Sequence, residues 1–437
     1  MSSTLKSKIY QLLFALIIFT LPSNLFFKFG ESYAYVNGLQ IDYLIPKFYL
    51  SDIFILLILL VWLFSQLHFF HINQIPSQIK KSLNSIIDPI EKNPILASLA
   101  LIFITRQLLT THPLASVWYL VKILEFSLLG IFIYKHRHLL LLRNFKKTIL
   151  LATFFTLIFQ SLLAIYQTYT QTSLFGYLFF GEPNLINYIG LAKHTIGGVE
   201  KILPYGTTAH PNILGGILAI YLIFAIYYLL KNSKKSLSRF AIILTILIPS
   251  YALYLTHSVS AWATFGVGIF LITAKKMLPK FKISSPQKTL FLSLSFILLT
   301  PLLINFFTPA HPKNPSLYRR IYLSDTALQM FEKSPFFGVG LNNFTTRVEK
   351  YSRTKEVARF AQPVHNIGWL FLSEVGLLGA IILLILIYKL PKKSQLVTPF
   401  LILLPIAALD HYLLTTQSGL LLLTLMLSKE ISKQKVL

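Results

Sequence analysis

His365 is followed directly by Asn366, where a long polar stretch ends and an apolar run begins. An imidazole has an unperturbed pKa of about 6.5, so a histidine can accept or release a proton at neutral pH. Glu374 stands nine residues further on, inside the apolar run, where an ionisable side chain is costly and usually has a function or a partner. The pattern predicts His365 as a general base, with Asn366 fixing its orientation and Glu374 supporting it. A purely structural histidine at a helix entry is the alternative.

The polar stretch before His365 is rich in cations. Residues 308–363 hold nine Lys or Arg side chains against four acids. Arg319 and Arg320 stand out because apolar and aromatic residues surround them, whereas Lys350–Arg359 is typical of a solvated face. The guanidinium group is planar and permanently charged, and it can bind phosphate oxygens through two parallel hydrogen bonds. We therefore expect residues 308–365, termed the lid, to cover an anionic, lipid-borne substrate. A helix capped by Ser324 is expected to follow the two arginines.

Two other histidines lie in short polar segments. His210 precedes a proline and Asn212 at a helix start, and an outward helix N-terminus attracts anions through its free N–H groups. A simple helix-entry turn explains this pattern as well. His257 lies in a turn of small hydroxyl residues, which often only bind the freed backbone. Arg106, near the end of an apolar segment, can snorkel to the interface or reach the same site.

The composition is that of a membrane protein. Hydrophobic residues make up 54% of the 437 residues and charged residues only 13%, which is about half the charged fraction of a soluble domain. A span needs roughly 20 apolar residues to cross about 30 Å of hydrocarbon. We expect an all-α polytopic membrane protein, a single domain over residues 1–437, with the lid between spans nine and ten. The twelve candidate spans are Ile9–Phe27, Leu50–Leu67, Pro94–Leu109, Leu114–Tyr134, Thr148–Thr168, Asn212–Leu230, Phe240–Leu255, Ala261–Thr273, Thr289–Phe307, Asn366–Tyr388, Leu396–Leu409 and Leu413–Leu427.

The distribution of charge predicts the orientation. The net charge is +25, and most Lys and Arg residues fall in alternate short loops, which is typical of loops that stay in the cytoplasm. Both termini are therefore expected inside and the lid outside, in a multi-pass protein of the cytoplasmic (inner) membrane. No small-residue cleavage site follows the first span, so we expect it to be retained rather than removed as a signal peptide. Lys122 and Glu125, three residues apart in the fourth span, are expected to form an ion pair.

Several partners and chemistries are not expected. The positive charge is spread over short loops beside spans, so the lipid bilayer is the expected partner and nucleic acid is not. The absence of cysteine excludes disulfides, thiolate catalysis and thiolate metal sites. We find no nucleotide-binding glycine loop and no zinc or magnesium motif, so neither a metal nor a cofactor is expected.

Four blocks of this sequence, in order, resemble the O-antigen ligase family, which includes O-antigen polymerases and protein O-oligosaccharyltransferases. The blocks are 206–212, 257–262, 319–344 and 363–379. Any single block is a weak signal, but the last two at this separation are fairly specific. The resemblance covers the chain from about the fourth span to the end.

This resemblance implies a reaction. The donor would be an undecaprenyl-pyrophosphate-linked glycan, transferred at the outer leaflet to a hydroxyl of a glycolipid, polysaccharide or protein, with inversion and without metal. His365 would be the base, and Arg319 or Arg320 would bind the pyrophosphate. Val259 stands where the family usually has a second arginine, and Lys201, His257 or Arg106 could substitute for it.

Other functions fit part of the sequence. A polymerase of the same family would use the same residues, and a degenerate member would bind the glycan lipid without turnover. A transporter or flippase for lipid-linked or anionic solutes also often has twelve spans, but transporters tend to show two similar halves. We see no such repeat, and the large polar segment lies outside and late in the chain, which favours a membrane glycosyltransferase.

Overall fold

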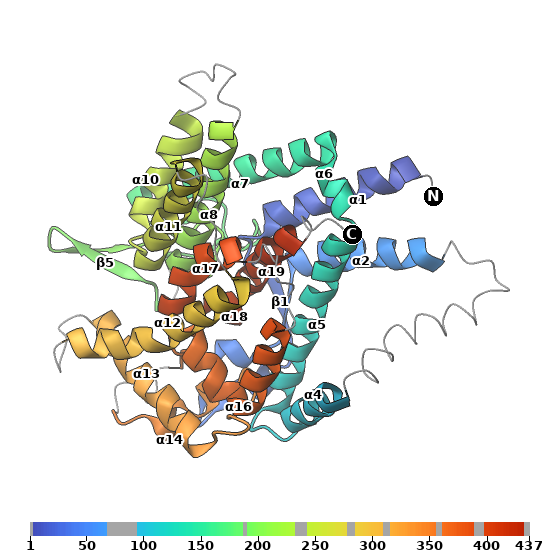
Figure 1. Ribbon diagram of the computed structural model, residues 1–437. Helices are drawn as coiled ribbons and strands as arrows, with labels where there is room; N and C mark the ends of the chain where they lie inside the picture. Colours follow the sequence, from blue (N-terminus) through green and yellow to red (C-terminus); the bar gives the residue numbers. More distant parts are fainter. Residues whose placement is uncertain are drawn as a thin grey trace.

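The computed structural model describes residues 3–67, 94–186, 190–231, 243–277, 285–308, 315–354, 361–388 and 397–431, and it is mostly helical (Figure 1). The longer helices are α1 (Ser3–Thr20), α2 (Leu50–Leu67), α4 (Pro94–Gln107), α5 (Pro113–Lys135), α7 (Arg143–Thr170), α8 (Pro211–Lys231), α11 (Val259–Met277), α12 (Pro286–Phe307), α13 (Pro315–Lys333), α16 (Ile367–Tyr388), α17 (Val397–Leu409) and α19 (Gln417–Ile431). The shorter ones are α6 (Arg137–Leu141), η4 (Ile243–Leu247), α10 (Ile248–Leu255), α14 (Val348–Tyr351) and α18 (Tyr412–Thr415), with 3-10 turns η1 (Glu31–Ala34), η2 (Asp42–Leu44) and η5 (Phe344–Thr346).

Five described helices, namely α5, α7, α8, α12 and α16, are long and apolar enough to cross a membrane by length and composition. Six shorter apolar helices lie in α2, α4, η4–α10, α11, α17 and α19. Together with α1, each expected span coincides with a helix. The first expected span, Ile9–Phe27, extends too far, because α1 ends at Thr20. Pro22 disfavours a helical conformation at the residue before it, and Phe26 already belongs to a strand.

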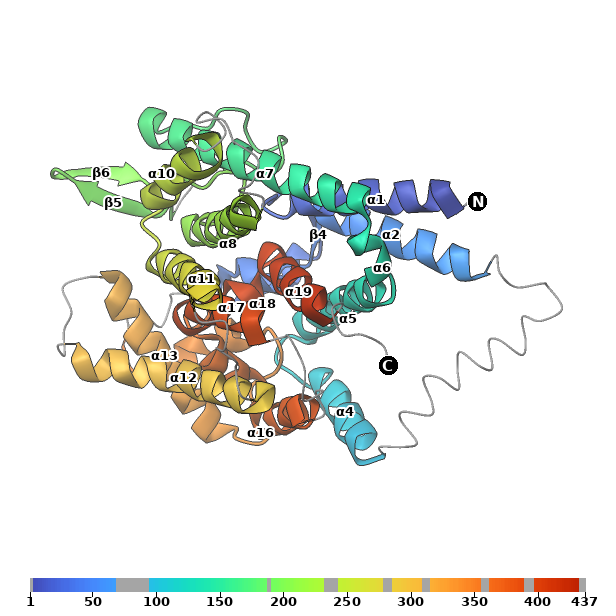
Figure 2. The same ribbon diagram turned by 45° about the horizontal axis from the view of Figure 1, so that its top comes forward.

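The basic segments that predict the inner face lie mostly outside the described residues, at 68–93, 232–242, 278–284 and 389–396. Of the five long apolar helices α8 is the most buried, and Figure 2 shows α7, α10 and α11 around it. Gly216 lets the segment after α17 approach α8, since a Cβ at this position would lie 1.9 Å from the Tyr412 hydroxyl.

Three small antiparallel sheets depart from the expected all-α fold. They pair β1 (Phe26–Lys28) with β4 (Lys47–Tyr49), β2 (Tyr35–Val36) with β3 (Leu39–Gln40), and β5 (Lys193–Ile196) with β6 (Val199–Ile202). All three lie in segments that connect helices. The β5–β6 hairpin turns at Gly197 and Gly198, which both have positive φ angles that glycine adopts without steric cost.

A buried ion cluster joins α2 to α5. The Lys122 ammonium lies 3.1 Å from the Glu125 carboxylate, which confirms the expected pair, and it also contacts the Asp52 carboxylate. Asp52 accepts further hydrogen bonds from the Tyr49 backbone N–H at 2.8 Å and from the Gln417 side chain of α19. Side chains of three helices thus meet around one buried lysine.

Replacing Asp52 with asparagine is expected to lower the free energy of unfolding by about 3 kcal/mol, because it leaves the buried Lys122 charge poorly compensated. The matched control is Glu31→Gln, which removes the exposed ion pair with Lys28 at 2.8 Å and should cost less than about 1 kcal/mol. Unfolding of both variants in a denaturant series, in the same lipid–detergent mixture, measures the difference. Equal losses would contradict a stabilising role for the cluster.

The lid folds around its own hydrophobic core, which α13 and α14 share with the first turn of α16. The buried core residues are Leu323, Ala327, Met330, Val339, Phe344, Val348, Val364 and Leu370. The expected helix start at Ser324 is wrong, because α13 already begins at Pro315. The Ser324 hydroxyl donates to the Arg320 carbonyl and the Thr326 hydroxyl to the Tyr322 carbonyl, both at 2.8 Å. These hydroxyls therefore bond back within the helix instead of capping it.

Candidate functional site

Three segments that connect helices contact described residues of the lid. They are residues 21–49, 108–112 and 410–416. The Asn342 side chain donates to the Tyr43 carbonyl at 2.8 Å, and the His112 backbone N–H donates to the Asn343 side chain at 2.9 Å. These segments were expected on the outer face, and their contacts with the lid define the candidate site.

Backbone hydrogen bonds dock the lid on α16. The N–H groups of Val339 and Gly340 donate to the carbonyls of Ser373 and Glu374 at 2.9 and 2.8 Å. These carbonyls are accessible because Gly376, with φ 61° and ψ −161°, interrupts the helix. The lid cannot shift along α16 without breaking this pairing.

Close packing explains two glycines, Gly338 in the sequence block 319–344 and Gly376 in the block 363–379. A Cβ at Gly338 would lie 2.3 Å from the Glu374 backbone carbon, and one at Gly376 would lie 2.6 Å from that of Phe336. The Glu374 side chain accepts a hydrogen bond from the Phe344 backbone N–H at 3.1 Å. Glu374 therefore holds the lid turn in place, and its polar contacts are with the lid rather than with His365.

His365 lies two residues before the start of α16, at a junction of three helices. The Asn366 side chain accepts from the Trp369 backbone N–H at 3.0 Å and donates to the carbonyls of Ile297 and Ala408 at 2.7 and 3.0 Å. Asn366 thus ties α16 to α12 and α17, and it fixes the backbone at His365 rather than the ring. The His365 Nδ1 atom is buried and has no hydrogen-bond partner among the described residues.

His411, which the sequence analysis missed, packs against His365. The two ring centroids are 5.0 Å apart in an edge-to-face arrangement. The Nδ1 atom of His411 lies 2.7 Å from the Thr415 hydroxyl, which orients the second ring. His411 and Asp410 occupy the three-residue gap between the last two expected spans, for which the sequence analysis made no prediction.

Asp410 joins three elements of the site. Its carboxylate accepts hydrogen bonds from the Asn212 side chain at 3.1 Å and from the Ser260 hydroxyl at 2.5 Å. Asn212 and Ser260 stand at the starts of α8 and α11. Asp410 is only 3% exposed, so these bonds supply the partners that a buried carboxylate needs. The sequence signal that could have found it is an acid beside a histidine between two apolar segments.

Burial controls the charge of the three histidines in this cluster. Burial lowers the pKa of His365 well below its usual range, and neighbouring His411 and Arg320 lower it further. Burial likewise lowers the pKa of His411 to about 3. The pKa of His210 is lowered by burial and partly restored by Asp410. All three rings are therefore neutral near pH 7.

Arg319 and Arg320 both lie in α13, but they differ in their effect on the cluster. The charge of Arg320 lowers the pKa of all three histidines, whereas Arg319 is the smallest of the causes that act on His365. The Arg320 Nε atom is buried and has no hydrogen-bond partner within the described ranges. Arg320 is therefore the arginine that acts most strongly on the histidine cluster.

The other sequence candidates make different contacts. Lys201 of β6 pairs across the hairpin with His194, whose ring stacks on His257 at 4.2 Å between centroids. Val259 is 70% exposed and borders a shallow hollow that His257 and Trp262 also line. The contacts of His257 and Lys201 are thus with the hairpin surface rather than with His365.

Arg106 bonds to the turn that follows its own helix. Its Nη1 donates to the Leu109 carbonyl at 2.9 Å, at the end of α4. Among the described residues there is no group of three or more His, Cys, Asp or Glu side chains that could hold a metal ion.

Comparison with known proteins identifies one segment of the chain. Residues 244–384 match a family model described as O-antigen ligase. No curated protein and no solved structure matches the chain. The matched segment contains His365, Arg319 and Arg320, and it confirms the resemblance noted from the sequence. Asn212, Asp410 and His411 lie outside it, and their place in the site rests on the contacts described above.

Proposed function

We propose that this chain, a member of the O-antigen ligase family through residues 244–384, moves a glycan from undecaprenyl pyrophosphate to an acceptor hydroxyl at the outer membrane face. The observation that carries the proposal is a pair of buried atoms, Nδ1 of His365 and Nε of Arg320, in one cluster, neither of which has a hydrogen-bond partner in the part of the chain that the structure describes. Buried polar atoms of native proteins are nearly always paired. A bound anion and a bound hydroxyl would supply the two missing partners.

In the proposed reaction the acceptor oxygen attacks the anomeric carbon as the bond from that carbon to the pyrophosphate oxygen breaks. The acceptor proton passes to the neutral imidazole of His365, and the bonding electrons leave with the pyrophosphate. Arg320 compensates the negative charge that develops on the leaving group, which is often the largest contribution to catalysis. A single displacement of this kind inverts the anomeric configuration.

Donor binding would also activate the base. An anion beside Arg320 offsets one of the positive charges that lower the pKa of His365, so the imidazole becomes more basic once the donor is bound. His411 remains neutral because burial lowers its pKa to about 3. Only the complete complex would then hold a strong base beside the acceptor hydroxyl.

The transporter alternative fits these observations less well. Transporters bind their solutes near the bilayer midplane, between two halves of the protein that move relative to one another. Here the titratable cluster forms among segments that connect helices, and backbone bonds fix the lid to α16. A polymerase would use the same cluster and would differ only in its acceptor.

Product analysis tests the proposal. Purified protein in nanodiscs is supplied with an undecaprenyl-pyrophosphate glycan of known anomeric configuration, an acceptor glycolipid and a chelator. The expected result is one carrier pyrophosphate released per glycan transferred, with the opposite configuration in the product by NMR. Retention of configuration, or glycan flux across the membrane without bond cleavage, would overturn the proposal.

The pH profile should reflect the lowered pKa of His365. A base must be deprotonated to act, and a lowered pKa in the free enzyme keeps it so below the ordinary value of about 6.5. We expect kcat/KM for the donor to stay level as the pH falls through about 6.5 and to decline only at lower pH. The acid limb of the kcat profile should lie at a higher pH than that of kcat/KM, because bound donor raises the pKa of His365. An acid limb of kcat/KM at or above about 6.5 would contradict this assignment of the base.

A further inference from the structure

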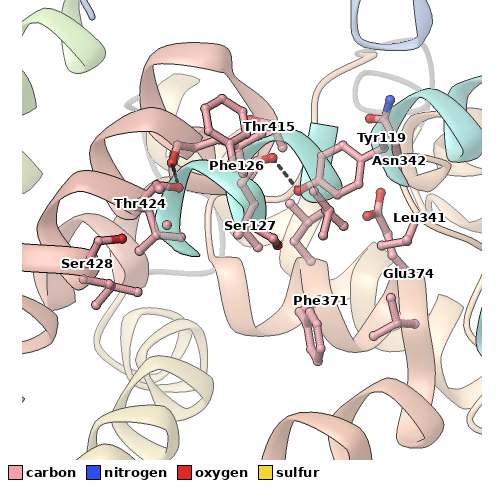
Figure 3. Close-up of a pocket in the computed structure, with 18 residues that line it drawn as sticks. Tyr119, Phe126, Ser127, Leu341, Asn342, Phe371, Glu374, Thr415, Thr424 and Ser428 are labelled. Carbon is pink, nitrogen blue, oxygen red and sulfur yellow. Dashed lines mark hydrogen bonds between the residues drawn. The ribbon is translucent and has the colours of Figure 1, made fainter. Parts of the chain in front are cut away.

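An apolar groove of about 370 Å³ lies between α5, α16 and α19 (Figure 3). One wall is the face of α5 from Tyr119 to Gly130, and the opposite wall is the face of α19 from Leu420 to Ser428. Phe371 of α16 lines the third side. Along each wall the lining residues recur every three or four positions, so each helix contributes one continuous stripe.

The groove is long and narrow. Gly130 lies eleven positions after Tyr119, which corresponds to about 16 Å of helix, or roughly half of a 30 Å hydrocarbon layer. Ile123 in its wall is 38% exposed, so the groove is open along its side. These dimensions suit a flexible hydrocarbon chain that enters sideways from the membrane.

One end of the groove lies beside the candidate site. Thr415 lines the groove, and its hydroxyl lies 2.7 Å from Nδ1 of His411. The His411 ring in turn packs on His365 at 5.0 Å between centroids. Tyr119, also in the lining at this end, donates a hydrogen bond to the Leu414 carbonyl at 2.6 Å. One short turn thus separates the end of the groove from the proposed base.

We propose that this groove binds the isoprenoid chain of the lipid pyrophosphate donor, an inference that rests on the proposed function. In the donor, the pyrophosphate is bonded directly to the first carbon of the isoprenoid, so the chain must begin beside the reaction centre. A glycolipid acceptor differs, because sugars separate its reactive hydroxyl from its acyl chains. A hydrocarbon groove that ends one turn from His365 therefore fits the donor chain.

The polar groups that line the groove fit a donor whose chain, rather than its pyrophosphate, lies in the groove. Glu374 and Asn342 line it, and the Glu374 carboxylate already accepts the Phe344 backbone N–H. A carboxylate in that position disfavours an anionic head group, which instead finds its countercharge at Arg320. The chain lies in the groove while the pyrophosphate lies beyond His411.

Binding of two carrier pyrophosphates without glycan tests the proposal. Undecaprenyl pyrophosphate and geranyl pyrophosphate are titrated against wild type and Ser127→Phe in identical nanodiscs. Ser127 is an exposed serine in the wall of the groove, and phenylalanine fills the space. The matched control is Ser295→Phe on α12, a helix that does not line the groove. Thr424→Phe, from the facing wall, replaces Ser127→Phe if the latter does not fold.

We expect Ser127→Phe to weaken undecaprenyl pyrophosphate binding about tenfold, the loss for roughly two methylene groups displaced from the groove. Its affinity for geranyl pyrophosphate should stay within about twofold of wild type, and Ser295→Phe should match wild type with both. Equal affinity of all three proteins for the long chain, or an equal loss for both chains, would overturn the groove assignment. Groove-dependent binding without any glycan transfer would instead refute the proposed function and leave the groove standing.

Discussion

His365→Ala is expected to lower kcat for glycan transfer about 10³-fold while the dissociation constant of the donor changes little. A positioned general base contributes roughly 10²–10⁴-fold, and the neutral His365 ring is the proposed proton acceptor. The donor is bound mainly through its pyrophosphate and chain, so its affinity should survive. Single-turnover rates at saturating donor, together with direct donor binding, separate the two effects.

The matched control for this variant is His257→Ala. His257 was also a sequence candidate, but it is exposed and stacks on His194 of the hairpin. We expect its rate to stay within about threefold of wild type. A comparable loss in both variants would show that His365 has no special role as the base.

Arg320→Gln is expected to lower kcat by about 10²–10³-fold, the usual cost of removing one charge-stabilising donor. Arg320→Lys should recover only part of this loss, because lysine keeps the charge but cannot offer two parallel donors to a pyrophosphate. The assignment is checked by comparing transfer rates with the natural donor and with a donor that carries a better leaving group. The rate loss caused by Arg320→Gln should be smaller with the second donor, because its leaving group needs less stabilisation.

Arg319→Gln is the control that distinguishes two adjacent arginines. Arg319 is the smallest of the causes acting on the pKa of His365, whereas Arg320 acts on the whole histidine cluster. The Arg319 variant should lose less than about tenfold. A larger loss than in Arg320→Gln would reassign the pyrophosphate contact to Arg319.

Helix positions could be predicted because they follow from local sequence. Apolar segments within a bilayer must satisfy their backbone hydrogen bonds internally, so they form helices. Each of the twelve expected segments overlaps a helix, and five of the described helices are long and apolar enough to cross a membrane. The lid and its end at His365 were equally visible, as a polar interruption. The glycines of the last two blocks were visible as a pattern, but the reason for them is the tight pairing of the lid with the kink at Gly376.

What the sequence could not provide depends on contacts between distant segments. An acid beside a histidine between two apolar segments singles out Asp410, but its place in the site follows from the hydrogen bonds that Asn212 and Ser260 donate from two other helices. The start of α13 was misplaced because Ser324 resembles a cap until its bond back to Arg320 is seen. His257 and Lys201 were chosen by residue type, and their stacking and pairing with the hairpin required the fold.

The most direct test is acceptor-dependent release of undecaprenyl pyrophosphate in one turnover, with wild type and His365→Ala compared in the same nanodiscs. We predict that wild type releases the carrier only when acceptor is present, and that the variant binds the same donor but releases about 10³-fold more slowly. Release by wild type without acceptor, or an unimpaired rate in the variant, would contradict a transferase that uses His365 as its base.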